Sequence, residues 1–191
     1  MIRTQAYKDF GNVSAGRLFV NKELLPRIIA KLPDIGSVLF VGEHRYWCYQ
    51  SFFNNPAKLM DFKSIDIHPG SGKIGDENYY PTPDYNMSIE TCDGIPDDSF
   101  DCIVMIGVYE YLDHKKEAFA QIYRMLKPGG IAVMSIVGEG YDPAPNNHIK
   151  PENVWNDLLP LRVDEVYTTY EQKDKPPTAV HVVAKKVLSG V

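Results

Sequence analysis

Asp66 is the residue whose type and position point most directly to chemistry. It stands near the end of FKSIDI, a run that predicts a strand, and the turn HPGSG follows at once. A carboxylate at the end of a parallel strand can accept hydrogen bonds from both hydroxyls of a ribose. An exposed aspartate that only opens the turn is the alternative. Asp66 is therefore our first candidate for contact with a nucleotide-like ligand.

His148 and Tyr109 are the residues that could assist a reaction. His148 lies in the loop VGEGYDPAPNNHIK, and an imidazole with an ordinary pKa of about 6.5 suits a general base. A surface histidine is the alternative. Tyr109 and Tyr111 flank Glu110 after an apolar run, so their rings could attract a cationic centre or pack in the core.

Alternating strands and helices must position these residues. Strands are predicted at SVLFVG, FKSIDI, about 87–90, 102–108 and IAVMSIV. Helical patterns cover about 21–32 and 115–126. This alternation predicts a mostly parallel sheet covered on both faces, with ligands bound at the carboxyl ends of the strands.

The end of the chain separates this sheet from an ordinary dinucleotide-binding one. RVDEVYTTY and TAVHVVAKK are strand-like, and only EQKDKPP joins them. A parallel crossover needs about a dozen residues or more. The two strands are therefore expected to form an antiparallel hairpin at the edge of the sheet.

Composition restricts the partners. With 191 residues, 44% of them hydrophobic, we expect one domain over 1–191, with a helical N-terminal segment at 1–35 and a core at 36–186. The net charge of -5 gives no general attraction to nucleic acid or anionic lipid. No apolar run approaches the roughly 20 residues that span a bilayer, and no secretory signal is visible, so we expect a cytoplasmic location. The scattered histidines and cysteines show no metal-ligand spacing, so no metal is expected.

The block DDSFDCIVMIGVYEYLDHKKEAFAQIYRMLKPGGIAVMSI resembles the centre of class I S-adenosylmethionine-dependent methyltransferases of the small-molecule type. In that family SFD opens strand four and LKPGG precedes strand five. With SVLFVG, IDI and the terminal hairpin, the resemblance spans about 36–186. It implies an α/β, Rossmann-like fold: a mostly parallel seven-stranded sheet with a C-terminal antiparallel hairpin and helices on both faces.

The resemblance also implies a cofactor, S-adenosylmethionine, and a small-molecule substrate. The cofactor-binding positions that it implies are Gly42, Glu43, His44, Asp66, Ile67, Ser88, Ile89 and Ile106. Ser88 and Ile89 would frame the adenine. The segment HPGSGKIGDENYYPTPDYN stands where a helix would usually follow strand two, and its tyrosines could stack on a ring-containing substrate or simply pack.

The glycine-rich loop of the family is altered in VLFVGEHRYW. Phe40 replaces the usual strand acid, and His44 and Tyr46 occupy later glycine positions. Either the loop re-forms, with Glu43 on the cofactor's amino group and Tyr46 or Trp47 on its sulfonium, or its bulky side chains fill the pocket.

Three functions follow as hypotheses. The first is methyl transfer from S-adenosylmethionine to an oxygen or nitrogen of a small molecule. The second is a catalytically inactive relative that acts as a binding or scaffold module. A nicotinamide-dependent oxidoreductase is the weakest, because the chain lacks the glycine fingerprint and ends in a hairpin. The sequence does not indicate an oligomeric state.

Overall fold

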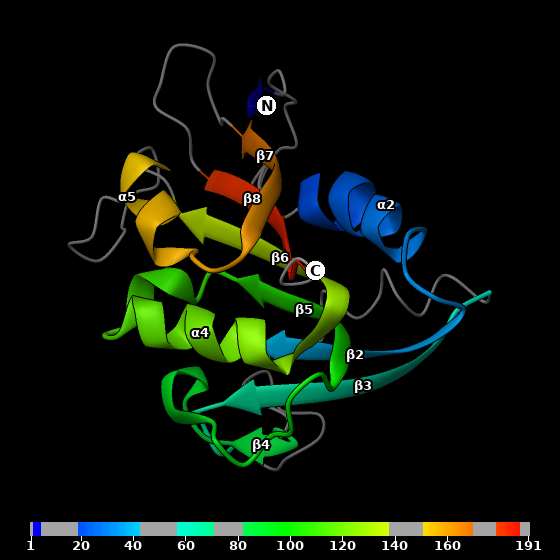
Figure 1. The fold of residues 1–191 in the computed structure, drawn as a ribbon, viewed down its shortest axis with the longest axis vertical. Coiled ribbons are helices and arrows are strands. Elements are labelled where there is room, and N and C mark those ends of the chain that lie inside the picture. The colour runs from blue at the N-terminus through cyan, green and yellow to red at the C-terminus, as the bar shows by residue number, and fades with distance from the viewer. Residues whose placement is uncertain are drawn as a thin grey trace.

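The computed structural model describes residues 2–4, 19–42, 57–70, 82–137, 151–169 and 179–187. These residues build one eight-stranded sheet in the order β1-β7-β8-β6-β5-β2-β3-β4 (Figure 1). The strands are β1 (Ile2–Thr4), β2 (Ile35–Val41), β3 (Leu59–Asp66), β4 (Tyr85–Asn86), β5 (Phe100–Ile106), β6 (Leu126–Val137), β7 (Arg162–Thr169) and β8 (Ala179–Lys185). The helical segments are η1 (Val20–Leu24), α2 (Leu25–Ile29), η2 (Ile89–Thr91), η3 (Tyr109–Tyr111), α4 (Lys115–Met125) and α5 (Pro151–Asp157).

The parallel part of the sheet brings the carboxyl ends of its strands to one edge. β2 pairs in parallel with both β3 and β5, and β5 pairs in parallel with β6. The arrowheads of these four strands point to the same side in Figure 1. The strand order reverses beside β2, since the chain builds β3 and β4 outward on one side and β5 and β6 on the other. Open α/β sheets bind ligands at such a reversal.

The C-terminal hairpin is confirmed. β7 pairs antiparallel with β8, and β8 pairs antiparallel with β6. Seven strands thus follow the expected fold. An eighth strand that we did not expect, β1, pairs in parallel with β7 at the outer edge. Three residues carry too little periodicity to predict a strand, and this one is fixed by its neighbour in the sheet rather than by local preference.

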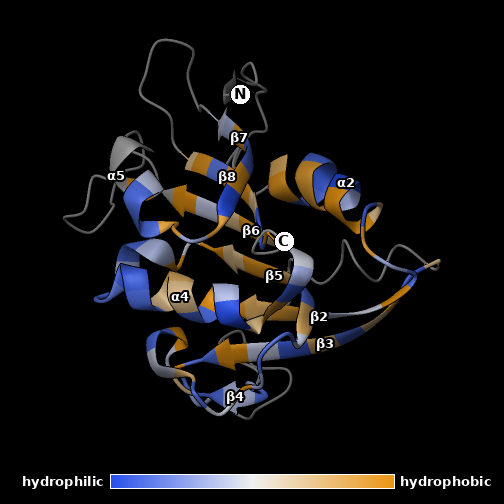
Figure 2. Ribbon diagram, viewed as in Figure 1, coloured by the Kyte–Doolittle hydropathy of each residue, from blue (hydrophilic) through white to orange (hydrophobic). Residues whose placement is uncertain are grey.

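Helices cover both faces of the sheet, each over its own apolar cluster. On one face, α4 and α5 contribute buried residues such as Phe119, Ile122 and Val154. On the other face, η1 contributes Leu24 and α2 contributes Ile28. In Figure 2 the central strands β5 and β6 are largely hydrophobic, and α4 carries both kinds of residue. Strands covered on both faces account for the continuous apolar runs in the sequence.

The third strand of the parallel part lies earlier than predicted. The expectation of about 87–90 is wrong by two to four residues, because β4 covers Tyr85–Asn86. Ser88 instead caps the short helix η2, and its Oγ accepts a hydrogen bond from Glu90 N at 3.1 Å. A serine cap favours a helical turn over an extended strand. None of the helices in the described part of the chain is long and apolar enough to cross a membrane.

Candidate functional site

Gly42 begins the site, immediately after β2. Its φ of +67° lies in the left-handed region, and its N–H donates to Ile65 O at 3.0 Å. A Cβ built on Gly42 would lie 2.3 Å from Cγ2 of Val108. Glycine is therefore required here both for the backbone conformation and for the close approach of the Val108 side chain.

Gly107 is the matching turn at the end of the neighbouring strand β5. It too has a positive φ, +65°, and its N–H donates to Ser135 O at 2.9 Å. Unlike Gly42, it has open space where a Cβ would stand, since no atom of the described residues beyond its chain neighbours lies within 4 Å. Two tight turns thus meet at the strand reversal, and the second leaves room above its backbone.

Asp66 ends β3 at the same edge. Its Oδ1 accepts a hydrogen bond from His68 N at 2.7 Å, which orients the carboxylate in the turn. Asn86, at the end of β4, donates from Nδ2 to Asp66 O at 2.9 Å and to Ile67 O at 3.1 Å. The turn after β3 is therefore held from two sides, and the carboxylate stands beside the strand reversal as the sequence suggested.

Ile67, Ser88 and Ile89 take different positions around this turn. Ile67 is 76% exposed, which is unusual for a large aliphatic residue and leaves an apolar face beside Asp66. Ser88 follows β4 as the cap of η2, whereas Ile89 is buried in the core. Ile106, the last residue of β5, is partly buried and packs against the α2-side cluster.

The Tyr109 side chain is fixed by contacts of both its hydroxyl and its ring. Its hydroxyl donates to Asp157 Oδ2 at 2.7 Å, and Lys115 Nζ lies 5.2 Å from the ring centroid. Burial and the Asp157 carboxylate raise the pKa of the phenol above its ordinary value. The ring is buried and already faces a lysine ammonium, so we assign no catalytic step to Tyr109. Tyr111, by contrast, is 72% exposed.

Several predicted site residues lie outside the described ranges. These are Glu43, His44, Tyr46, Trp47 and His148. Phe40 is described, and it is fully buried and packs with Phe62 at a centroid distance of 6.0 Å. The position that carries an acid in the family therefore belongs here to the apolar core.

Sequence reasoning missed three members of this edge. Asn86, Gly107 and Val108 hold or shape the turns, yet each depends on contacts between segments far apart in the chain. The glycine after the apolar run was the one visible signal, since a glycine there suggests a turn with positive φ. In the described part of the chain, no His, Cys, Asp and Glu side chains gather in a group that could hold a metal ion.

The residues of this edge fit an adenosine group. The Asp66 carboxylate matches a ribose diol, the exposed Ile67 side chain offers an apolar face for a purine, and the space above Gly107 is open. With the reversed strand order and the terminal hairpin, this arrangement defines a protein with a Rossmann-like methyltransferase fold.

Comparison with known proteins agrees with that class. Residues 50–134 match a family described as methyltransferase domain. Over 78 residues the chain is 33% identical to the ubiquinone/menaquinone biosynthesis C-methyltransferase UbiE of Geotalea daltonii; the match covers 39% of this chain and 32% of that relative. The chain is therefore similar to methyltransferases over its central part, and it spans about a third of the length of that relative.

Solved structures share the fold at low sequence identity. A SAM-dependent methyltransferase from Archaeoglobus fulgidus superposes with a TM-score of 0.67 at 17% identity, covering 89% of this chain and 94% of that one. One from Aquifex aeolicus gives 0.62 at 17% identity, covering 91% and 94%. The [4+2]-cyclase SpnF gives 0.61 at 13% identity, covering 87% and 81%. Because this fold also occurs in a protein named for a different reaction, the architecture alone does not define the chemistry.

Proposed function

We propose that this protein binds S-adenosylmethionine and catalyses methyl transfer to a small molecule. One observation carries the proposal: Asp66, Gly42 and Gly107 end three adjacent parallel strands at the point where the strand order reverses. A carboxylate, a close-packed glycine turn and an open glycine turn together suit a nucleoside with a short tail.

Each of these residues has a proposed role. Asp66 accepts hydrogen bonds from the ribose hydroxyls, and its orientation is maintained by His68 N. Ile67 packs on the adenine, which Ser88 and Ile89 frame from the start of η2. Gly42 and Ile106 lie under the tail of the cofactor. Glu43 and His44 stay predictions for the amino-acid end of the cofactor.

The chain's contribution to the reaction is mainly orientation. The bound cofactor supplies an electrophilic methyl group on a sulfonium. Residues at the carboxyl edge hold an oxygen or nitrogen of the acceptor in line with it, and such positioning accounts for much of the acceleration in group transfer. His148 stays the predicted general base for an acceptor that must lose a proton.

Titration calorimetry with S-adenosylmethionine and S-adenosylhomocysteine tests the proposal. Both should bind the wild-type chain. Asp66→Asn keeps an oxygen for His68 N but loses the charge, so S-adenosylhomocysteine should bind more weakly by about 1–3 kcal/mol. Asp61→Asn on the same strand is the matched control, because Asp61 is 69% exposed and lies far from the carboxyl edge. If neither S-adenosylmethionine nor S-adenosylhomocysteine binds, the proposal is overturned.

A non-catalytic methyltransferase-like protein is the second candidate, and Phe40 is the observation that favours it. A buried phenylalanine stands where the family has the strand acid, so this position offers no carboxylate to a cofactor. The two candidates differ in measurable ways. Binding of S-adenosylhomocysteine without turnover of S-adenosylmethionine across an acceptor panel would support the second.

A further inference from the structure

His181 on β8 is a buried imidazole that the proposed function does not use. The residue is 0% exposed. A hydrogen bond of 3.1 Å joins its Nε2 to Thr169 Oγ1, and the ring of Phe19 lies 5.0 Å away between centroids. Its Nδ1 is buried and has no hydrogen-bond partner in the part of the chain that the structure describes. Buried polar atoms normally have a hydrogen-bond partner, so we expect this nitrogen to have one as well.

The strand registers place His181 at the level of the candidate cofactor site. Ile106 pairs with Ser135, and Ser135 pairs with His181, so the three side chains share one face of the sheet. Val41 pairs with Met105, so the next residue, Gly42, lies level with Ile106. His181 lies two strands from β5, or about 10 Å at the usual strand spacing.

On this face, the residues beside His181 and toward the carboxyl edge are slightly more exposed than those deeper in the sheet. Ser135 and Ala179 are 8% exposed and Thr169 is 7% exposed, whereas Val183, deeper on the same face, is 1% exposed. The most accessible neighbours of the imidazole therefore lie at the edge where the cofactor is proposed to bind. A small molecule held beside the cofactor would approach Nδ1 from this side.

The imidazole is neutral, and its surroundings favour one tautomer. Burial lowers the pKa of His181 from 6.5 to about 3. If Nε2 carries the proton and donates to Thr169 Oγ1, then Nδ1 keeps its lone pair; in the other tautomer Nδ1–H is a buried donor. Buried N–H groups without acceptors are rarer than under-satisfied acceptors. The tautomer with a free lone pair on Nδ1 is therefore favoured.

We propose that His181 and Ser135 form the acceptor subsite, in which Nδ1 accepts a hydrogen bond from a neutral hydroxyl or N–H group of the molecule to be methylated. This proposal rests on the proposed function. It defines the acceptor class, because a lone pair in apolar surroundings binds a neutral donor and repels a carboxylate. His181 orients the acceptor and does not store its proton.

Nitrogen-15 NMR of the histidine-labelled full chain tests the proposal directly. The probes are phenol as a neutral hydroxyl donor, toluene as its isostere without a donor, and benzoate as an anion, each with S-adenosylhomocysteine present. Phenol should shift the Nδ1 signal of His181 in the direction of hydrogen-bond acceptance, and the other two should not. An unchanged Nδ1 signal, or a proton already on Nδ1 in the free chain, would overturn the proposal.

Two substitutions separate the nitrogens of the ring. Asn places its oxygen near the position of Nδ1, and Gln places its amide near Nε2. His181→Asn should keep phenol binding within about 3-fold, whereas His181→Gln should weaken it by about 3- to 10-fold, the range expected for one hydrogen bond. Equal affinity of the two variants, or the reverse order, would count against Nδ1 as the acceptor.

Val183→Ala provides the matched control. Val183 lies two residues along the same face of β8 and is also buried. It should lower stability without changing phenol affinity; equal losses of phenol affinity for Val183→Ala and His181→Gln would mean that packing alone is measured. S-adenosylhomocysteine affinity is recorded for every variant. If the wild-type chain does not bind S-adenosylhomocysteine, the proposed function is refuted. If it binds S-adenosylhomocysteine but phenol does not shift the Nδ1 signal, only the acceptor subsite is refuted.

Discussion

At the scale of single residues, Gly42 is the most constrained position at the candidate site. Two separate demands fall on it, a φ of +67° and contact with the Val108 side chain. Gly107 meets only the first demand, since the space beside it is open. The two glycines therefore form a natural comparison between backbone strain and steric overlap.

Gly42→Ala should lower the free energy of unfolding by about 2–4 kcal/mol, because a left-handed alanine costs about 1–2 kcal/mol and the overlap with Val108 adds to it. Gly107→Ala should cost only the backbone part. Val108→Ala removes the side chain that overlaps with a Cβ at position 42. Once the cost of Val108→Ala alone is subtracted, the double variant should therefore lose only the backbone part. Urea unfolding of the four variants checks this, and equal losses for the two glycine variants would contradict it.

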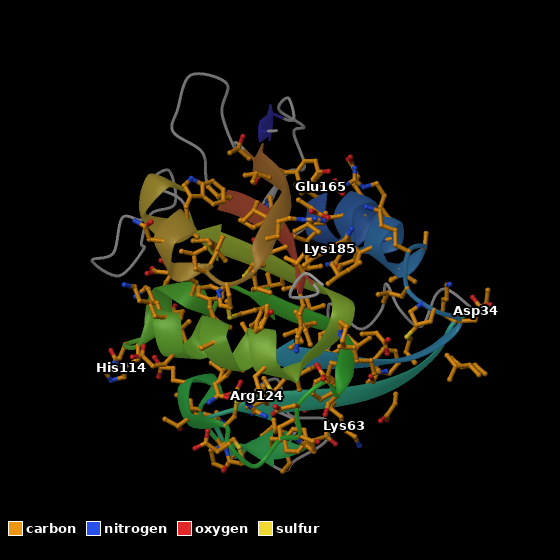
Figure 3. All side chains as sticks on the ribbon, viewed as in Figure 1. Asp34, Lys63, His114, Arg124, Glu165 and Lys185 are labelled. Atoms are coloured by element: carbon orange, nitrogen blue, oxygen red, sulfur yellow. The ribbon has the colours of Figure 1, made fainter. Side chains whose placement is uncertain are left out.

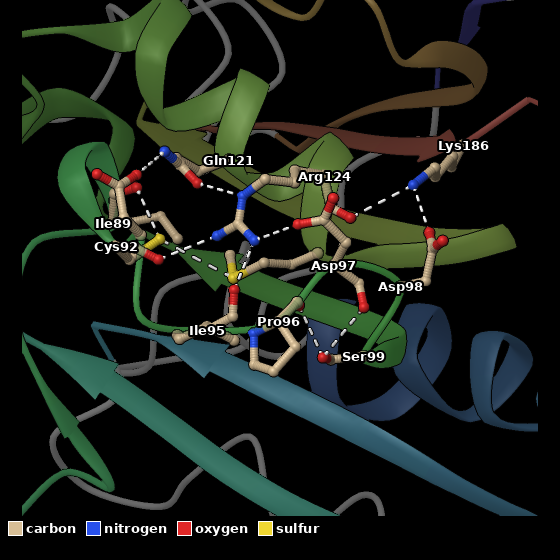
Figure 4. Close-up of polar contacts among 12 residues, drawn as sticks. Ile89, Cys92, Ile95, Pro96, Asp97, Asp98, Ser99, Gln121, Arg124 and Lys186 are labelled. Carbon is tan, nitrogen blue, oxygen red and sulfur yellow. Dashed lines mark hydrogen bonds and ion pairs between the residues drawn. The ribbon is translucent and has the colours of Figure 1, made fainter.

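At the scale of elements, Arg124 ties α4 to the loop that leads into β5. Its guanidinium donates to Cys92 O at 3.0 Å, Ile95 O at 2.5 Å and Asp97 Oδ1 at 2.6 Å, while its Nε donates to Gln121 Oε1 at 2.8 Å (Figure 4). Two of these acceptors are backbone carbonyls. The rigid fork of arginine can reach all of them at once, which a lysine ammonium cannot.

Arg124→Met should therefore lower the free energy of unfolding by about 2–4 kcal/mol, because it leaves the carbonyls of Cys92 and Ile95 without this donor. Arg124→Lys should recover only part of the loss. Lys116→Met, on the exposed face of the same helix, is the control and should change stability by less than about 0.5 kcal/mol. Thermal and urea unfolding measure these differences, and full recovery by lysine would show that charge alone matters.

Glu165 ties β7 to α2 by charge. Figure 3 shows it beside that helix, where its carboxylate accepts from Lys31 Nζ at 2.8 Å, from Arg27 Nη2 at 3.3 Å and from the Tyr167 hydroxyl. Burial alone would raise the pKa of Glu165, but the bonds from Lys31 and Tyr167 outweigh it and lower that pKa to about 2. The carboxylate thus stays ionised in the folded chain well below the pH at which it protonates in the unfolded chain.

A depressed carboxylate pKa contributes stability above the unfolded value of 4.5, and the contribution is lost as pH falls from 4.5 through about 2. Glu165→Gln should therefore cost about 1–2 kcal/mol at pH 6, a moderate figure because both cations are nearly half exposed, and much less at pH 3. Urea unfolding at the two pH values compares the variant with wild type. A constant difference between them would contradict the assignment.

At the scale of the whole molecule, sequence reasoning predicted what local pattern determines. The buried strands, α4 and the terminal hairpin follow from continuous apolar runs, a helical period and a short connection. Asp66 and Gly42 were chosen as candidate site residues because each ends such a run. His181 was not, because only the pairing of β8 between β6 and β7 places it beside Ser135. Register between distant strands is a property of the assembled sheet, and no single segment encodes it.

The same buried histidine should control how the whole molecule responds to acid. Burial lowers the pKa of His181 from 6.5 to about 3, so below pH 6.5 the unfolded chain binds a proton that the folded chain does not. Stability should then fall by about 1.4 kcal/mol per pH unit from pH 6.5 toward 3, which is a higher window than that of Glu165. His181→Phe, which keeps a ring but cannot be protonated, should flatten the profile between pH 7 and 5. His114→Gln at an exposed position should leave it unchanged. Urea unfolding across this range gives the profiles, and parallel curves for wild type and His181→Phe would mean that the imidazole is hydrated and titrates normally in the folded chain.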